Sequence, residues 1–256
     1  MSEIILAAGA DIKNRFLIAE GRRLTPGPEL GDLGTLAPYL KYKAGILSIL
    51  GRRRPTVVAC DLHPGYFSSR LARDAWPRIA RSARHGAGPK GFTGPRLVGI
   101  QHHHAHIASV IFEHGLTPPV LGVSFDGTGY GTDGRIWGGE FLRVQRRGFR
   151  RLAHLMYMRM PGGERVVREP WRMALSVLGD AALPFLRRVK KDDLRLVRAM
   201  LKSSLPMPMT SSAGRLFDAA AALAGLCPYA SFEAQDRKST RLNSSHWHVS
   251  RMPSSA

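Results

Sequence analysis

The sequence is poor in cysteine and has no long apolar run. Only two of its 256 residues are cysteines, Cys60 and Cys227, and neither has a partner at CxxC spacing. This argues against a zinc ribbon and a disulfide framework, and it fits a reducing compartment. No apolar stretch approaches the ~20 residues that a membrane-spanning helix needs, and the N-terminus lacks the basic region of a signal peptide. We therefore expect a cytoplasmic protein without a membrane partner.

Acidic residues are also scarce. The chain has 19 aspartates and glutamates against 38 lysines and arginines, a formal net charge of +19. These basic residues are spread from Lys13 to Arg251, whereas a dedicated nucleic-acid-binding protein usually gathers them on one face or arm. We do not expect a nucleic-acid partner, and a basic nucleic-acid-binding module without catalysis remains an alternative that rests on charge alone.

Short β-type runs alternate with helical patterns along the chain. We expect strands at 4–8, 15–19, 56–60, 97–101, 120–125 and 136–144, and helices at 36–50, 66–84, 102–114, 171–178, 184–201 and 213–226. A Gly/Pro-rich, basic stretch at 82–95 predicts a surface loop. The alternation indicates an α/β protein. Two strand–turn–strand units indicate two related lobes, which we place at 1–118 and 119–235.

Residues 236–256 differ from the rest of the chain. Their sequence, DRKSTRLNSSHWHVSRMPSSA, is rich in serine and has no apolar periodicity, which is typical of disorder. Asp236–His246 and Ser250–Ala256 can also be back-translated into strings that look like the constant arms of a sequencing-library adapter. We expect a non-native, adapter-derived and disordered tail here. A native Ser/Arg-rich tail is the alternative.

Four histidines follow the strand expected at 97–101, and two of them have metal-ligand spacing. His102 and His106 stand at i and i+4 of the helix expected to begin there, so their side chains lie on one face. Two imidazoles so placed can converge on one ion, and a carboxylate is needed to complete the site. The plainer interpretation is a polar helix start with one core histidine.

Asp126 ends the strand expected at 120–125 and begins a glycine-rich segment. Its carboxylate can reach a metal ion held by a neighbouring element, and the glycines that follow let backbone N–H groups approach phosphate oxygens. The segment is neither a Walker A motif nor a dinucleotide-binding fingerprint. A hairpin turn is the structural alternative, and Asp133-Gly134 suits it well.

Three further segments carry polar residues at strand–helix junctions or helix starts. Asp61 and His63 follow a strand, where α/β proteins place ligand-binding groups. Arg172 lies in the first turn of an expected helix, after Pro170. Asp218 lies one turn inside another expected helix, where its carboxylate could accept a hydrogen bond from a ribose hydroxyl. Each of these segments, taken alone, is explained by helix initiation.

Taken together and in order, six segments resemble the C-terminal, carbamoyl-transferring domain of the hydrogenase maturation carbamoyltransferase family, HypF. The resemblance runs from about Ile4 to Gln235. The segments are LAAGADIKN, DLHPGYFSSRLA, QHHHAHIASV, SFDGTGYGTDGRIWGGEFL, REPWRMAL and TSSAGRLFDAAAAL. The resemblance implies an actin-like ATPase fold, two-lobed, with mixed sheets and flanking helices. The second lobe would be incomplete, because the family's last metal-ligating aspartate lies beyond Gln235.

The resemblance also implies a site and a reaction. A divalent metal, iron or zinc, would be held by His102, His106 and Asp126. Residues expected to bind substrate or nucleotide are Asp61, Gly127, Thr128, Gly129, Gly131, Glu140, Arg172 and Asp218. Proton transfer would fall to His63, His103 or His104.

The reaction implied is transfer of a carbamoyl group from carbamoyl adenylate, made from carbamoyl phosphate and ATP, to the C-terminal cysteine of the partner HypE. The upstream domain that forms carbamoyl adenylate in the family has no counterpart in this chain, so we expect the fragment to be inactive alone. A tRNA threonylcarbamoyl-transferase-like enzyme is the alternative within the superfamily.

Overall fold

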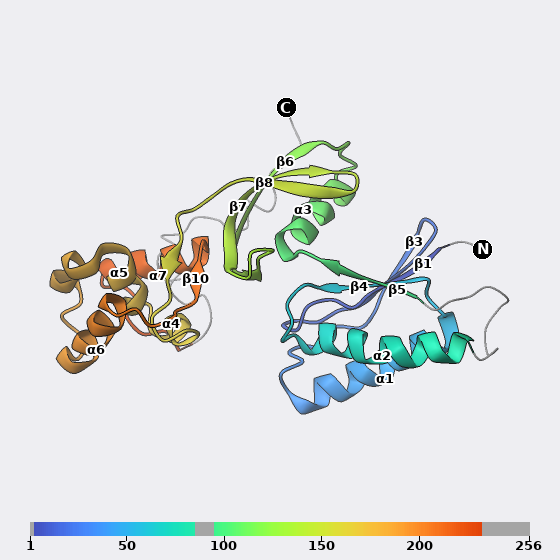
Figure 1. Ribbon diagram of the computed structural model, residues 1–256, viewed down its shortest axis with the longest axis horizontal. Coiled ribbons are helices and arrows are strands. Elements are labelled where there is room, and N and C mark those ends of the chain that lie inside the picture. The colour runs from blue at the N-terminus through green and yellow to red at the C-terminus, as the bar shows by residue number, and fades with distance from the viewer. Residues whose placement is uncertain (1–2, 85–94, 232–256) are drawn as a thin grey trace. The chain divides into compact units, whose positions relative to one another are not determined.

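The structure is a computed structural model that describes residues 3–84 and 95–231 (Figure 1). The chain divides into two compact units, Met1–Ala105 and His106–Ala256. The division falls inside helix α3 (His102–Glu113), earlier than the lobe boundary expected between residues 118 and 119. Of the surface loop expected at 82–95, residues 82–84 belong instead to helix α2 (Phe67–Arg84). Residues 85–94 lie outside the described ranges, as does the expected tail at 236–256.

The first unit is one five-stranded mixed sheet with two helices. Its strands are β1 (Ile4–Ala7), β2 (Leu17–Glu20), β3 (Arg23–Pro26), β4 (Val57–Asp61) and β5 (Arg96–Ile100), in the order β3-β2-β1-β4-β5. The first three strands are antiparallel, and β4 and β5 continue the sheet parallel to β1. Strand β3 was not predicted, because all four of its residues are exposed and no hydrophobic alternation marks it.

Helices α1 (Leu36–Arg53) and α2 (Phe67–Arg84) lie on one face of this sheet (Figure 1). Strand side chains that point to this face of the sheet, such as Leu6 and Val58, pack against Tyr42 and Ile46 of α1. Strands β1, β4 and β5 are parallel, so their carboxyl ends meet at one edge of the sheet. Asp61 is the last residue of β4, and His102 follows β5 at the start of α3.

The second unit combines an antiparallel meander with a group of helices. The meander consists of β6 (Val120–Tyr130), β7 (Ile136–Gln145) and β8 (Gly148–His154), and α3 packs Ile107 against its residues Trp137, Leu142 and Val144. The glycine-rich loop expected at 126–134 is mostly strand, because β6 continues to Tyr130 after a register shift between Phe125 and Gly129.

Two short strands join the meander to the helices. β10 (Met209–Thr210) pairs with β7 in parallel and with β9 (Met158–Arg159) in antiparallel fashion. The helices are α4 (Arg165–Arg168), α5 (Trp171–Leu178), the 3₁₀ helix η1 (Gly179–Phe185), α6 (Lys191–Lys202) and α7 (Ala213–Leu223). The single helix expected at 184–201 was wrong at its start, because Pro184 lies inside η1 and α6 begins only at Lys191.

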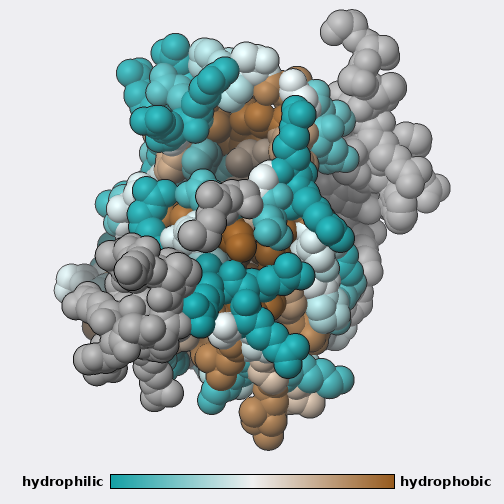
Figure 2. All heavy atoms as spheres, turned by 90° about the vertical axis from the view of Figure 1, so that its right-hand side faces the viewer, coloured by the Kyte–Doolittle hydropathy of each residue, from teal (hydrophilic) through white to brown (hydrophobic). Residues whose placement is uncertain are grey.

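The surface mixes hydrophilic and hydrophobic side chains. Figure 2 shows brown, hydrophobic side chains that reach the surface between teal, hydrophilic ones. The exposed apolar residues include Leu36, Leu40 and Leu47 of α1, at 73%, 53% and 45% relative exposure. Within the described residues, no helix is long and apolar enough to span a bilayer.

Candidate active site

Helix α3 begins directly after β5, and its first turn is held by Gln101. The buried Gln101 side chain accepts a hydrogen bond from the backbone N–H of His104 at 2.8 Å, and its amide nitrogen lies 3.1 Å from Nδ1 of His103. A side-chain acceptor at this position satisfies one of the unpaired N–H groups at a helix start. The start of α3 is thereby fixed at His102, and the i, i+4 relation of His102 and His106 follows.

Strand β6 brings a carboxylate to these two histidines. A ligand atom from each of His102, His106 and Asp126 lies within 4.8 Å of the other two. His106 Nε2 lies 3.9 Å from Asp126 Oδ2. The close approach of α3 and β6 depends on Gly122, where a Cβ atom would stand 2.3 Å from Ile107 Cδ1. The structure therefore assembles all three predicted metal ligands.

This group of donors suits a divalent metal ion. Ligand atoms around one tetrahedral zinc ion stand roughly 3.3 Å apart, since each metal–ligand bond measures ~2.0–2.1 Å. Small side-chain rotations would close the three donor atoms from within 4.8 Å to that spacing. Three protein ligands of the His₂-carboxylate type leave a coordination position for water or substrate, as catalytic sites require.

Asp61 contacts His102 and belongs to this site in a way that the sequence did not predict. Its Oδ2 lies 2.8 Å from His102 Nδ1, and its Oδ1 accepts a hydrogen bond from the His63 backbone N–H at 2.7 Å. A carboxylate that receives Nδ1–H fixes the imidazole tautomer and leaves Nε2 as the metal-binding atom. Asp61 was expected to bind substrate or nucleotide, whereas its observed contact orients a histidine.

The backbone of Asp126 and Gly127 is held by the start of α7. The Ser212 hydroxyl lies 2.7 Å from the Asp126 carbonyl oxygen and 2.8 Å from that of Gly127, and it accepts from the Arg215 N–H as the cap of α7. A Cβ atom on Gly214 would come within 2.8 Å of Gly127 Cα. Small residues therefore let a helix start pack directly against the candidate metal ligand.

The glycines expected to contact phosphate have different positions. Gly127 and Gly129 are buried in β6, and Gly129 is paired with Trp137, whereas Thr128 is exposed. Gly131 closes the turn to β7 through a 2.8 Å hydrogen bond from its N–H to the Arg135 carbonyl. The hairpin explains Gly131, and phosphate binding by the segment 127–131 stays a prediction.

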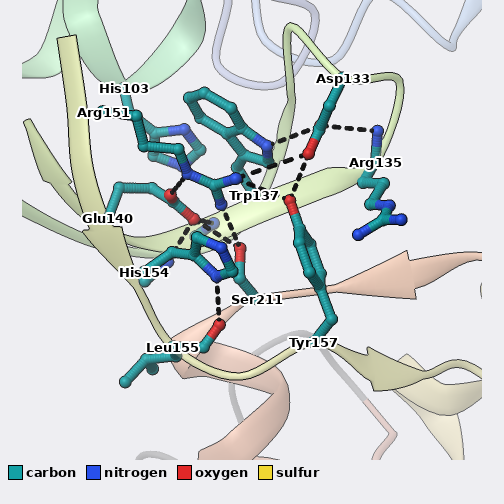
Figure 3. A network of polar contacts seen from close by, with 12 residues as sticks. His103, Asp133, Arg135, Trp137, Glu140, Arg151, His154, Leu155, Tyr157 and Ser211 are labelled. Carbon is teal, nitrogen blue, oxygen red and sulfur yellow. Dashed lines mark hydrogen bonds and ion pairs between the residues drawn. The ribbon is translucent and has the colours of Figure 1, made fainter.

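A network of polar groups lies beside the hairpin, around the buried Glu140 (Figure 3). Glu140 Oε2 accepts from Arg151 Nε at 2.6 Å, and Arg151 continues through Tyr157 to Asp133. The Arg151 guanidinium also lies 3.9 Å above the Trp137 ring. Burial disfavours the charged form of Glu140, but its hydrogen bonds from Arg151, Ser211 and the Gly138 and Gly139 backbone outweigh burial and lower its pKa.

Three residues expected to bind substrate or nucleotide are instead buried in ion pairs. Glu140 is 0% exposed, and Arg172 and Asp218 are 2% exposed. Arg172 donates to Glu169 Oε2 at 2.5 Å, and Arg215 Nη1 lies 2.8 Å from Asp218 Oδ2. The structure shows these three side chains in ion pairs, and their part in binding substrate or nucleotide stays a prediction.

The three histidines expected to transfer protons differ in their surroundings. His63 stacks on Tyr66 with ring centroids 4.2 Å apart, and its Nδ1 accepts from the Gly65 N–H. His103 is fully buried, whereas His104 is half-buried. Burial lowers the pKa of His104 and thereby favours its neutral form. Their role in proton transfer stays a prediction.

The fold and the site define a class of protein: a two-unit α/β protein with a His–His–carboxylate centre formed by one helix and one strand. Two family models match it, "HypF Kae1-like domain" over residues 1–113 and "Carbamoyltransferase, Kae1-like Domain, second subdomain" over residues 122–245. The chain belongs to the HypF family of carbamoyltransferases.

Individual relatives agree with this assignment. Carbamoyltransferase HypF2 of Cupriavidus necator is 38% identical over 237 residues, which are 90% of this chain and 28% of that protein. A HypF homolog from the same organism is also 38% identical, and the match covers 57% of its length. The match to the Rhizobium leguminosarum HypF, 37% identical, covers 29% of that protein. The chain thus spans between 28% and 57% of the length of these curated relatives.

Solved structures show the same fold. A full-length HypF in a phosphate- and nucleotide-bound form matches with a TM-score of 0.76 at 33% identity, over 92% of this chain and 30% of that one. The HypF of T. kodakarensis matches with a TM-score of 0.79 at 28% identity, over 92% of this chain and 32% of that one. The predicted α/β, two-lobed architecture is confirmed as a Kae1-like fold.

Proposed function

We propose that this chain transfers a carbamoyl group from carbamoyl adenylate to the C-terminal cysteine of a HypE-like acceptor during maturation of nickel–iron hydrogenases. The observation that carries the proposal is the convergence of His102, His106 and Asp126 within 4.8 Å in a chain of the HypF family. The family assignment favours this function over the tRNA-modifying and nucleic-acid-binding alternatives. A cytoplasmic location would fit the reaction.

In this proposal, His102, His106 and Asp126 hold a divalent metal, iron or zinc. When bound, the metal supplies Lewis-acid polarisation of a carbamoyl adenylate oxygen. Asp61 keeps His102 in the tautomer that leaves Nε2 for the metal, through the 2.8 Å contact at Nδ1. Ser212 and Gly214 keep the Asp126–Gly127 backbone against the start of α7. The residues of the chain thus orient the donor and need not act as the nucleophile.

The transfer itself needs one bond formed and one broken. The acceptor thiolate sulfur forms a bond to the carbamoyl carbon, and the bond from that carbon to the phosphate oxygen breaks. AMP leaves with the electron pair, while the proton of the acceptor thiol has already gone to a base or to water. Because a phosphate is a good leaving group, stabilisation of the departing charge matters more than a protonatable enzyme group.

The nucleotide part of the proposal draws support from a relative. A full-length HypF that resembles this chain was solved with phosphate and nucleotide bound. We propose ATP and carbamoyl phosphate as the source of the carbamoyl adenylate that this chain uses. The reaction proposed for this chain then begins from carbamoyl adenylate.

Titration of the purified, metal-free chain with Zn²⁺ or Co²⁺ tests the proposed site. We expect one bound ion per chain. The His102→Ala/His106→Ala double variant should lose this binding. His154→Ala, which removes an exposed histidine outside the site, should retain it. Unchanged affinity in the double variant would refute the metal site.

A further inference from the structure

Glu140 is fully buried, yet its carboxylate has a complete set of partners. Oε1 accepts hydrogen bonds from the backbone N–H groups of Gly138 and Gly139, at 3.1 and 3.2 Å, and from the Ser211 hydroxyl at 2.5 Å. Oε2 accepts from Arg151 Nε at 2.6 Å. The donors come from β7 itself, from β8 and from the segment between β10 and α7, so one side chain ties these three elements together (Figure 3).

The atoms that Glu140 holds are direct neighbours of Asp126. Gly139 is paired with Phe125 across the β6–β7 ladder. A Cβ atom on Gly138 would stand 2.6 Å from the Asp126 carbonyl oxygen. On the other side, Ser211 precedes Ser212, whose hydroxyl lies 2.7 Å from the same carbonyl oxygen. Glu140 is therefore hydrogen-bonded to both segments that lie against the Asp126 backbone, the one with Gly138 and Gly139 and the one with Ser211.

We infer that Glu140 is a positioning residue for the metal ligand Asp126, which rests on the metal site proposed above. Glu140 does not reach the metal or the substrate, because it is 0% exposed. It acts through Gly138, Gly139 and Ser211, which fix the carbonyl side of Asp126 and so limit where its carboxylate can point. Outer partners of metal ligands commonly change metal affinity ten- to a hundredfold when they are removed.

The charge of Glu140, and not only its shape, is needed for this role. A carboxylate is acceptor-only and can serve four donors, whereas the amide of glutamine presents an N–H₂ group on one side. In Glu140→Gln, that group would face either Arg151 or the cluster of Gly138, Gly139 and Ser211, both of which donate. The substitution therefore breaks at least one attachment while nearly preserving volume.

The matched control is Glu169→Gln. Glu169 forms a comparable close ion pair with Arg172, at 2.5 Å between Oε2 and Nε, in the same unit. Its pair belongs to the α4–α5 junction and holds neither of the segments that enclose Asp126. Both variants lose one carboxylate charge from a close pair with an arginine, so a general loss of stability should affect both alike.

The experiment measures the Zn²⁺ dissociation constant of wild type, Glu140→Gln and Glu169→Gln at a temperature where circular dichroism shows all three folded. We expect Glu140→Gln to bind Zn²⁺ about tenfold or more weakly and Glu169→Gln to bind within about twofold of wild type. Equal affinity in all three proteins, or equal losses in both variants, overturns the inference.

Two further variants keep the test decisive. If Glu140→Gln does not fold, Ser211→Ala provides the test. It removes a single donor to Glu140 and should weaken Zn²⁺ binding severalfold; unchanged affinity would contradict the inference.

The double variant His102→Ala/His106→Ala distinguishes the failure of the metal site from the failure of the role of Glu140. If that double variant loses Zn²⁺ while Glu140→Gln retains it fully, the metal site stands and the role of Glu140 fails. If wild type binds no Zn²⁺ at all, both fail.

Discussion

Two carboxylate–arginine pairs of the second unit differ in what surrounds them. Glu140 is 0% exposed and is joined by Arg151, Ser211 and two backbone N–H groups. Glu169 has a side chain that is 16% exposed and pairs with the buried Arg172 and with Arg165, whose side chain is 65% exposed. The first pair holds the hairpin beside Asp126, and the second fixes the start of a helix. A buried ion pair therefore gives no functional information until its neighbours are known.

The largest expected effect is on the free energy of unfolding, which should fall more when Glu140 is removed than when Glu169 is removed. Glu140→Ala leaves Arg151 and three other donors without their acceptor in a buried place, and this should cost about 3–5 kcal/mol. Glu169→Ala should cost less, about 1.5–3 kcal/mol, because the Glu169 carboxylate is partly exposed and one of its two arginine partners, Arg165, is 65% exposed. Urea unfolding of both variants and wild type measures the difference. A larger loss for Glu169→Ala would contradict the comparison.

A smaller effect concerns acid stability. The folded pKa of Glu140 lies below its ordinary value of 4.5, because its hydrogen bonds outweigh its burial. The ionised carboxylate therefore stabilises the fold above that ordinary value, and this contribution is lost as the pH falls through the folded pKa.

Glu140→Gln removes the titrating group, so its free energy of unfolding should fall less steeply than that of wild type between about pH 5 and pH 3. The pKa of Glu169 is lowered in the same direction by Arg172 and Arg165 against burial, so Glu169→Gln should also flatten the profile. Chemical unfolding across this pH range provides the measurement. A steeper acid loss in Glu140→Gln than in wild type would contradict the account.

The sequence predicted the parts of the site that depend on local spacing. The helix starting at His102 follows from its apolar periodicity, and this places His102 and His106 on one face. Asp126 was identified at the end of a β-type run, although β6 continues to Tyr130. Glycines after Asp126 indicated a loop because they lack strand propensity, and pairing with β7 overrides that preference.

The sequence pattern could not predict contacts between residues that lie far apart in the chain. Asp61 lies 41 residues before His102 and meets it only because β4 and β5 are parallel neighbours. Ser211 lies 71 residues after Glu140, and Arg151 reaches Glu140 through a strand, β8, that was not predicted. The ion pairs of Glu140, Arg172 and Asp218 were not predicted either, because a sequence does not show which of its charged residues pair with each other in the fold.

The central claim is that His102, His106 and Asp126 share one metal ion. The most direct test is an anomalous difference map from crystals of this chain grown with Zn²⁺ and measured across the zinc absorption edge. The account predicts a single strong peak ~2.0–2.2 Å from a nitrogen of His102, a nitrogen of His106 and an oxygen of Asp126. A zinc peak on other residues, with these three side chains free of it, would contradict the account.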